Sequence, residues 1–189
     1  MDTVTWRLGP EAALGLANSA HGPGAHYRRR ARASDPPHDH LVEAADAAEF
    51  LRTHHVPVPT ELPTADQLAR LRDLRRLIRA LADEPLLSTG AWRAEVDEAL
   101  ATVSFRLGPD DALCSAAPGW DGILDDLLPA ALALQGDRER MRRCGNPTCR
   151  WLFVDRSRRG DRVWCEAAVC GNRVKVGRHR RRAAAAARD

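Results

Sequence analysis

The chain has 189 residues, of which 44% are hydrophobic and 29% charged, and its formal net charge is +3. This balance is typical of a soluble globular protein and argues against a disordered chain. Because the sequence starts without a signal-peptide pattern and contains no run of ~20 apolar residues, we expect a cytoplasmic protein with no membrane partner.

Helical periodicity dominates the first half of the sequence. Short helices are predicted over 11–19 and 41–53, on either side of a loop over 20–39 that is rich in Gly, His and Arg. Leucines and one isoleucine then recur at steps of three and four between Leu68 and Leu81. They predict a long amphipathic helix with Thr64 as its N-cap and Pro85 just past its end.

The pattern then changes to helix, hairpin and helix. We expect a helix over 92–103, two strands over 103–107 and 112–116 around the polar turn 108–111, and an apolar helix over 123–135. The predicted fold class of residues 1–137 is therefore mainly α with a small β hairpin (α+β). A small C-terminal zinc-finger module followed by a basic helix completes the predicted architecture.

Charge changes sign near residue 137. Residues 138–189 contain 16 Arg and Lys against 5 Asp and Glu, whereas residues 1–137 contain 13 against 21. Such a distribution predicts a basic arm that binds a polyanion, attached to an acidic body that does not. We place the boundary between two domains, 1–137 and 138–189, at this change.

Four cysteines of the C-terminal domain form two closely spaced pairs, which are Cys144 with Cys149 and Cys165 with Cys170. Two such pairs separated by a loop can surround one Zn²⁺ with four thiolates, so we predict Zn²⁺ as the cofactor. Four thiolates leave no open coordination position, and the site is therefore expected to be structural and not catalytic. Cys114 lies outside the pattern and is expected to be a small buried residue.

Other chemistries of four cysteines stay open. They are two disulfides, four unrelated thiols or an iron–sulfur cluster. A reducing cytoplasm disfavours disulfides, and the paired spacing favours zinc.

Each cysteine pair is accompanied by Gly and Asn, at Gly145-Asn146 and Gly171-Asn172. Glycine after a ligand permits a positive φ that turns backbone amides toward sulfur. Asn172 is suited to cap a following helix.

Between the pairs, Asp155 and Ser157 are expected to fix a turn through side-chain hydrogen bonds to the backbone. A miniature apolar core around the metal is expected from Trp151, Phe153, Val163 and Trp164.

Three runs of the C-terminal domain resemble the bacterial CGNR zinc-finger family. They are Cys144-Gly-Asn-Pro-Thr-Cys149-Arg-Trp-Leu-Phe153-Val-Asp155-Arg-Ser157 and Cys170-Gly171-Asn172-Arg173-Val-Lys175, with Arg162-Val-Trp164-Cys165 between them. In that family the finger follows an N-terminal ABATE domain, which residues Leu14-Gly-Leu-Ala-Asn18-Ser19 resemble. The resemblance implies a stress-responsive transcriptional regulator.

After the last cysteine the sequence is strongly basic and favourable to helix. Such a helix, held by a rigid metal module, is suited to lie in a groove of DNA or along its phosphates. The candidate nucleic-acid-binding residues are Arg173, Lys175, Arg178, Arg180, Arg181 and Arg182. Alternatives are a solvated tail, a tail that pairs with the acidic body, and RNA or an anionic protein as the partner.

We therefore expect a DNA-binding regulator whose N-terminal domain senses a small-molecule ligand or mediates self-association into a homodimer. A different hypothesis is a ligand-binding or protein-interaction module in which the zinc finger is only a stabilising cap. An enzyme is not expected, because no Gly-rich phosphate loop or catalytic motif is present. A metal site at His38, His40, His54 and His55 is the alternative to loop histidines, which we expect because no third ligand at helical spacing accompanies them. The basic cluster 27–32 is expected to be an exposed loop, with a clamp for phosphate or a small anion as the alternative.

Overall fold

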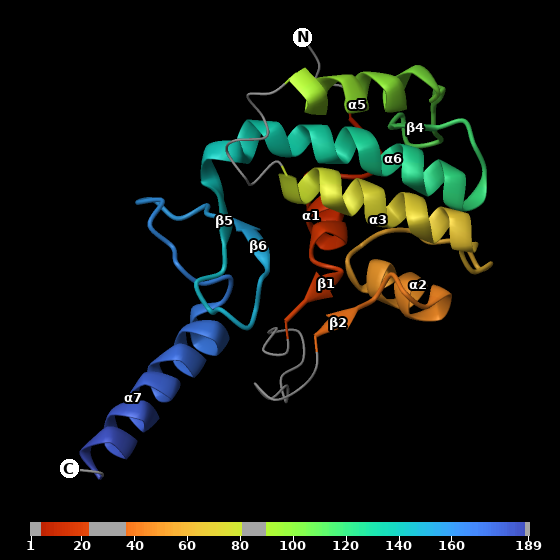
Figure 1. Cartoon of the computed structure of the whole chain (residues 1–189). Helices are drawn as coiled ribbons and strands as arrows, with labels where there is room; N and C mark the ends of the chain where they lie inside the picture. Colours follow the sequence, from red (N-terminus) through yellow and green to blue (C-terminus); the bar gives the residue numbers. More distant parts are fainter. Residues whose placement is uncertain (1–4, 23–36, 81–89, 188–189) are drawn as a thin grey trace. The chain divides into compact units, whose positions relative to one another are not determined.

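The computed structural model describes residues 5–22, 37–80 and 90–187 (Figure 1). Its described residues are mainly helical, with small two-stranded sheets, as the sequence predicts. They form two compact units. One unit is drawn from Met1–Ser19 and Asp39–Glu139, and the other from Ala20–His38 and Arg140–Asp189.

Three helices of the first unit pack against one another: α1 (Pro10–Ala17), α3 (Ala65–Ala80) and α6 (Gly119–Ala133). A fourth, α2 (Ala44–Thr53), packs against α1 and α3 (Figure 1). The helical spacing of leucine and isoleucine gives each helix an apolar face. The core that results contains fully buried Leu16, Leu71, Ile78, Ile123 and Leu127.

The predicted start of the long helix is confirmed. Gln67 donates its backbone N–H to Thr64 Oγ1 at 3.2 Å, and Thr64 donates its own N–H to Gln67 Oε1 at 3.0 Å. This reciprocal capping box satisfies two donors that the first turn leaves unpaired. The expected end of the helix at Leu81 and Pro85 lies outside the described residues.

The predicted hairpin is present. After α5 (Gly90–Ala101), strands β3 (Phe105–Leu107) and β4 (Leu113–Ser115) pair antiparallel, with Arg106 opposite Cys114. Gly108 donates its N–H to the carbonyl of Ala112 at 2.8 Å, and Asp111 adopts a φ of 56° in the turn. Cys114 is a buried free thiol, as expected.

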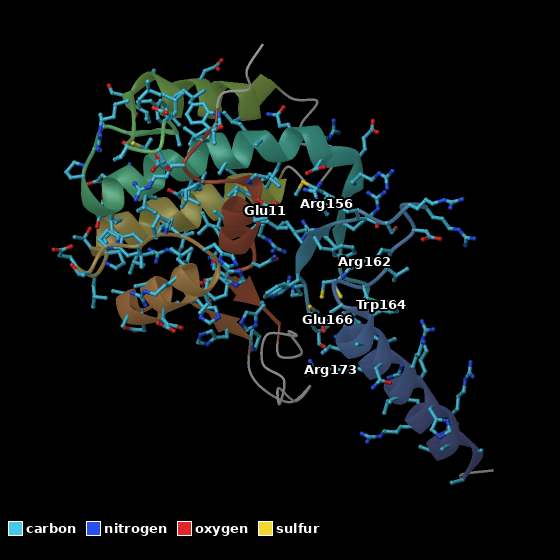
Figure 2. The ribbon with its side chains drawn as sticks, turned by 180° about the vertical axis from the view of Figure 1, so that it is seen from behind. Glu11, Arg156, Arg162, Trp164, Glu166 and Arg173 are labelled. Carbon is cyan, nitrogen blue, oxygen red and sulfur yellow. The ribbon has the colours of Figure 1, made fainter. Side chains whose placement is uncertain are left out.

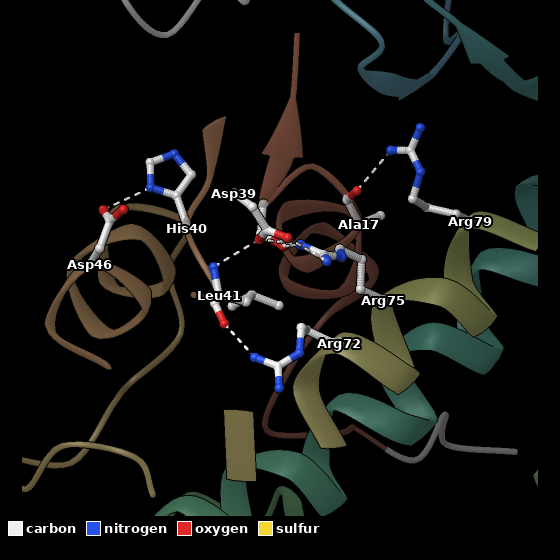
Figure 3. Close-up of polar contacts among 9 residues, drawn as sticks. Ala17, Asp39, His40, Leu41, Asp46, Arg72, Arg75 and Arg79 are labelled. Carbon is white, nitrogen blue, oxygen red and sulfur yellow. Dashed lines mark hydrogen bonds and ion pairs between the residues drawn. The ribbon is translucent and has the colours of Figure 1, made fainter. Parts of the chain in front are cut away.

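Three arginines on one face of α3 hold neighbouring segments of the first unit (Figure 3). Arg72 donates a hydrogen bond to the carbonyl of Leu41 at 2.7 Å, and Arg79 donates one to the carbonyl of Ala17 at 2.9 Å. Arg75 donates two to the carboxylate of Asp39, at 2.6 and 2.8 Å. Burial alone raises the pKa of Asp39, but the hydrogen bonds from Arg75 and from Leu41 N–H outweigh it and lower that pKa. The carboxylate therefore stays ionised.

The second unit contains short two-stranded sheets and the C-terminal helix. Strand β1 (Ala20–His21) pairs with β2 (His38–Asp39), within the segment that the sequence predicts to be loop. After the 3₁₀ helix η1 (Leu134–Arg140), β5 (Met141–Arg143) pairs antiparallel with β6 (Leu152–Val154). A π-helical turn, η2 (Ala167–Gly171), leads into α7 (Asn172–Ala186). Among the described helices, none has the length and apolar character that crossing a bilayer requires.

Candidate metal centre and nucleic-acid interface

The four predicted cysteine ligands lie together in the second unit. Their sulfur atoms all lie within 4.8 Å of one another, and the Sγ–Sγ distances of Cys165 to Cys149 and Cys170 are 3.7 and 3.6 Å. Disulfide sulfurs are much closer, at about 2.05 Å, and the cysteines are free. A tetrahedral ion with bonds of about 2.3 Å separates its sulfurs by about 3.8 Å, so the cluster fits one zinc ion.

The first pair lies in the loop between β5 and β6. Cys144 donates its N–H to the carbonyl of Trp151 at 2.8 Å, and Cys149 donates its N–H to the carbonyl of Asn146 at 2.9 Å. Arg150 takes a φ of 63°, which turns the chain from the loop into β6. Contacts among the thiols lower the pKa of Cys144 and raise the pKa of Cys149 and Cys165, whereas a bound metal requires all four as thiolates.

The second pair is held by the turn that starts α7. The carbonyl of Glu166 accepts hydrogen bonds from the N–H groups of Cys170 at 2.8 Å and Gly171 at 3.4 Å. Cys170 is fully buried and lies inside η2, which continues into α7. One ligand of the candidate metal is therefore part of the same helical segment that carries the basic residues.

Asn146 contacts both cysteine pairs and was not predicted as a site residue. It is buried, its amide Nδ2 lies 3.7 Å from Sγ of Cys170, and its Oδ1 accepts the N–H and hydroxyl of Thr148 at 3.2 and 3.0 Å. An N–H directed at sulfur stabilises a thiolate and orients it toward a metal. The one feature of the sequence that points to Asn146 is the Gly-Asn dipeptide that recurs beside each cysteine pair.

The expected positive φ of the paired glycines is wrong. Among the described residues, positive φ at glycine occurs at Gly119 and Gly160, whereas Gly171 has a φ of −61°. Close packing explains Gly145 and Gly171 instead. A Cβ on Gly145 would lie 2.6 Å from Cγ1 of Val163 and 3.1 Å from the ring of Trp164, and a Cβ on Gly171 would lie 3.0 Å from that ring. Trp164 therefore packs against the backbone of both cysteine loops.

The expected capping role of Asn172 is also wrong. Gly171 and Asn172 already have helical φ and ψ, and no side-chain cap hydrogen bond forms at this start. The reason is that η2 runs directly into α7, so that no extended residue separates them. Asn172 is an exposed residue of the first turn.

The loop between the pairs is organised by polar contacts. Asp155 Oδ1 accepts the N–H of Ser157 at 2.9 Å, and its Oδ2 accepts the N–H of Arg162 at 2.8 Å. The hydrogen bond from Ser157, together with those backbone N–H groups, lowers the pKa of Asp155 to about 2. Asp155 and Ser157 thus form the predicted turn. Ser157 also accepts the N–H of Gly160 at 3.2 Å.

Arg162 links this turn to the second cysteine pair. Its Nε donates to the carbonyl of Trp164 at 2.8 Å, its Nη2 donates to the carbonyl of Cys165, and its guanidinium lies 5.0 Å from the ring centre of Phe153 (Figure 2). The sequence places Arg162 in a run that resembles the family, but it gives no indication of what the guanidinium contacts. Of the expected apolar core, Trp151 and Trp164 pack against the cysteines, while Val163 is 53% exposed.

The candidate nucleic-acid contacts lie along α7. This helix contains six basic residues and no acidic one, and none of its residues is buried. Figure 2 shows its side chains spreading around the helix axis. Exposure on every side matches the absence of an apolar stripe in the sequence. The basic residues of the helix are Arg173, Lys175, Arg178, Arg180, Arg181 and Arg182.

One side of α7 faces a groove of about 520 Å³ within the second unit. The opposite wall is the loop 146–148 between the first two cysteines. The α7 wall includes Arg173, Gly177, Arg180 and Arg181, and the described residues that line the groove include no acidic one. The groove therefore combines a positive wall with direct proximity to the candidate metal centre.

The histidine predicted to lie in a loop at position 40 is a packed residue of the first unit. His40 is buried, its Nδ1 lies 2.8 Å from Asp46 Oδ1, and its ring stacks on Phe50 with centres 4.2 Å apart. These contacts give His40 a packing role. The basic cluster 27–32 lies outside the described residues.

Comparison with protein families gives two adjacent matches. Residues 11–140 match the ABATE family, whose description is "Putative stress-induced transcription regulator", and residues 140–183 match the CGNR zinc finger. A search of curated proteins finds no significant match. The matches together cover the packed helices, the four cysteines and most of α7. The chain belongs to the family in which an ABATE domain is followed by a CGNR zinc finger.

Proposed function

We propose that the protein is a cytoplasmic, zinc-containing transcription regulator that binds DNA through α7. The observation that carries this proposal is the continuity of η2 and α7: the segment that bears Cys170 continues as an exposed helix with six basic residues. A metal centre at its base fixes the direction in which the helix leaves the module. Charge of this density favours binding to the phosphates of nucleic acid.

Cys144, Cys149, Cys165 and Cys170 are the proposed zinc ligands. The mutual distances of their sulfurs support one tetrahedral ion, and four thiolates leave no position for substrate or water. The zinc thus has a structural role. Its binding energy replaces the large apolar core that a module of this size lacks.

The proposed DNA contacts are the basic residues of α7, whose positive charges attract the phosphates of the backbone. If all six contact phosphates, the logarithm of the binding constant should fall with the logarithm of salt concentration with a slope of about −5. Stress is the signal that the family description suggests.

The first unit is proposed to sense a small molecule or to mediate self-association. A groove of about 310 Å³ within this unit supports a ligand, because Leu74, Leu77 and Leu124 form an apolar wall. Its polar groups include Arg70 and Arg76, which are paired with Asp125 and Asp73 of the same lining. Sedimentation of the purified chain tests self-association.

The decisive experiment measures DNA binding and metal content on the same full-length preparation. We expect about one zinc per chain, and steeply salt-dependent binding to duplex DNA that is lost when a chelator removes the metal. Undiminished binding by the zinc-free chain would refute the proposed support of α7 by zinc. A zinc-loaded chain without affinity for DNA would favour the alternative of a ligand-binding or protein-interaction module whose finger is a stabilising cap.

A further inference from the structure

The groove between loop 146–148 and α7 separates the basic residues of the helix into two sets. At 3.6 residues per turn, Arg173, Arg180 and Arg181 share the side that lines the groove. Lys175, Arg178 and Arg182 occupy the opposite side, at steps of three and four. Both sets are accessible, because no residue of α7 is buried. The structure therefore distinguishes positive charges that the sequence presents as equivalent.

Gly177 lies in the middle of the groove wall, where a helix would ordinarily be more stable with alanine. Packing within the protein does not require the glycine. A Cβ at this position would meet only Nη1 of Arg181, the far end of a flexible side chain, at an ordinary contact distance of 3.5 Å. The missing side chain instead leaves the helix backbone open to something that enters the groove.

The walls of the groove combine apolar and cationic surface. Pro147 and Val176 contribute apolar surface, and Val176 is 39% exposed although it lies on a highly charged helix. Arg180 and Arg181 contribute guanidinium groups, which bind phosphate oxygens in bidentate fashion. A deoxyribose-phosphate chain offers the matching alternation of apolar sugar and anionic phosphate.

We propose that this groove binds one sugar-phosphate strand of duplex DNA. Arg180 and Arg181 contact consecutive phosphates, and Gly177 allows the strand to approach the helix backbone. The apolar surface of Pro147 and Val176 lies against deoxyribose, where the 2′-hydroxyl of RNA would lose water without gaining a hydrogen-bond partner. This inference rests on the proposed function and assigns it to one side of α7.

Two double variants of the zinc-loaded, full-length chain test the assignment. Arg180→Ala with Arg181→Ala removes two charges from the groove, and Arg178→Ala with Arg182→Ala removes two from the opposite side. Both variants replace the same residue type within the same part of α7, so net charge and helix propensity change equally. Circular dichroism and zinc content check that both are folded.

The readout is fluorescence anisotropy with a labelled duplex of mixed sequence, measured over a range of salt concentrations. The groove variant should weaken binding about tenfold more than the opposite variant and reduce the salt slope by about two, because two phosphate contacts are lost. The opposite variant should change the slope by less than about one, because Arg178 and Arg182 then act on the duplex at longer range and through screened charge. An RNA duplex of the same sequence should bind more weakly than the DNA.

Each other outcome is also decisive. Equal losses in the two double variants would overturn the groove assignment while leaving DNA binding by α7 intact. Tighter binding of the RNA duplex would overturn deoxyribose recognition. If the unaltered chain binds neither duplex, the proposed function fails, and the groove assignment fails with it.

Gly177→Ala gives an independent test that does not change charge. This variant should stabilise α7 and nevertheless weaken DNA binding several-fold, because the added methyl group occupies the path of the strand. His179→Ala, on the side away from the groove, is its control and should leave binding nearly unchanged. Unchanged binding by Gly177→Ala would contradict the close approach.

Discussion

The side-chain amide of Asn146 lies 3.7 Å from Sγ of Cys170, although 24 residues separate them in the sequence. The contact joins the loop of the first cysteine pair to the helical turn of the second. Oδ1 of the same side chain accepts hydrogen bonds from the N–H and hydroxyl groups of Thr148. These bonds fix the amide with its N–H group toward sulfur. Asn146 is therefore well placed to tune metal affinity without being a ligand.

Replacing this amide by a carboxylate should weaken zinc binding. We expect Asn146→Asp to lower zinc affinity by about 10- to 100-fold, since a negative charge would face thiolates. Competition with a chromophoric chelator measures the affinity. Asn172→Asp is the matched control, because it makes the same change at an exposed first-turn position of α7 where an acidic group is favourable. Equal losses in both variants would contradict the role assigned to Asn146.

Gly22 should be essential for the attachment of β1 to the cysteine loop. Its N–H donates to the carbonyl of Cys149 at 3.3 Å, and a Cβ on Gly22 would overlap the carbonyl oxygen of Thr148. Gly22→Ala should lower the free energy of unfolding by about 1–3 kcal/mol and speed hydrogen exchange in the loop. Gly136→Ala, where a Cβ meets nothing within 4 Å, should have little effect. A stable Gly22→Ala protein with unchanged exchange would refute this contact.

The Arg75–Asp39 pair predicts a pH-dependent loss of stability. Asp39 has a lowered pKa in the folded chain, so its stabilising contribution is present above the unfolded pKa of about 4 and is lost as pH falls through the folded value. Arg75→Met leaves a partly buried carboxylate without its arginine and should cost about 1–3 kcal/mol at neutral pH. The cost should shrink in acid, where Asp39 can protonate.

Arg76→Met is the control for this measurement. Arg76 lies next to Arg75 on α3, but its side chain is 72% exposed and its partner Asp73 is 69% exposed. A pair of this kind contributes at most about 1 kcal/mol. Urea unfolding measures the free energy of unfolding of both variants. A pH range of about 3 to 7 covers the interval in which Asp39 is expected to titrate. A larger cost for Arg76→Met would contradict the importance of the buried pair.

Asp126 predicts a pH dependence of opposite sign. It is 1% exposed, and burial raises its pKa even though the N–H of Ser115 donates to it at 2.5 Å. The folded chain therefore retains this proton at a pH where the unfolded chain has released it. The contribution of Asp126 to stability should fall as pH rises from about 4 through the folded pKa.

Asp126→Asn should remove this slope, because an amide keeps an oxygen for Ser115 without ionising. The stability of the variant relative to the unaltered chain should increase with pH over that interval, as measured by urea unfolding. Asp121→Asn, at a side chain that is 49% exposed, serves as the control. A relative stability that does not change with pH would exclude Asp126 as the titrating group.

Much of the fold follows from local patterns. The leucine spacing predicted α3, Thr64 was predicted as its N-cap, and a polar turn predicted the β3–β4 hairpin. Each of these features depends on residues close together in sequence. The four cysteines were equally accessible to prediction, since ligand spacing reflects the geometry of the ion. Prediction was weaker at element ends: α6 begins at Gly119 and not at Ile123.

The roles of single residues around the cysteines depended on contacts between distant segments. Gly145 and Gly171 suggested positive φ, but close packing is the reason for their small size, by Val163 and Trp164 at Gly145 and by Trp164 at Gly171. Arg162 resembles every other arginine until the hairpin folds and directs its guanidinium to the carbonyl groups of Trp164 and Cys165. No periodicity encodes such contacts.

The sequence by itself determined the helices, the cysteine cluster and the positive charge of the tail, because these depend on residue type and spacing along the chain. Only the tertiary structure decided that Asn146 faces Cys170, that Gly22 lies against the cysteine loop, and that Arg180 and Arg181 line a groove. The physical reason is that packing and hydrogen bonding act between surfaces that folding brings together, whereas periodicity and composition describe one segment at a time.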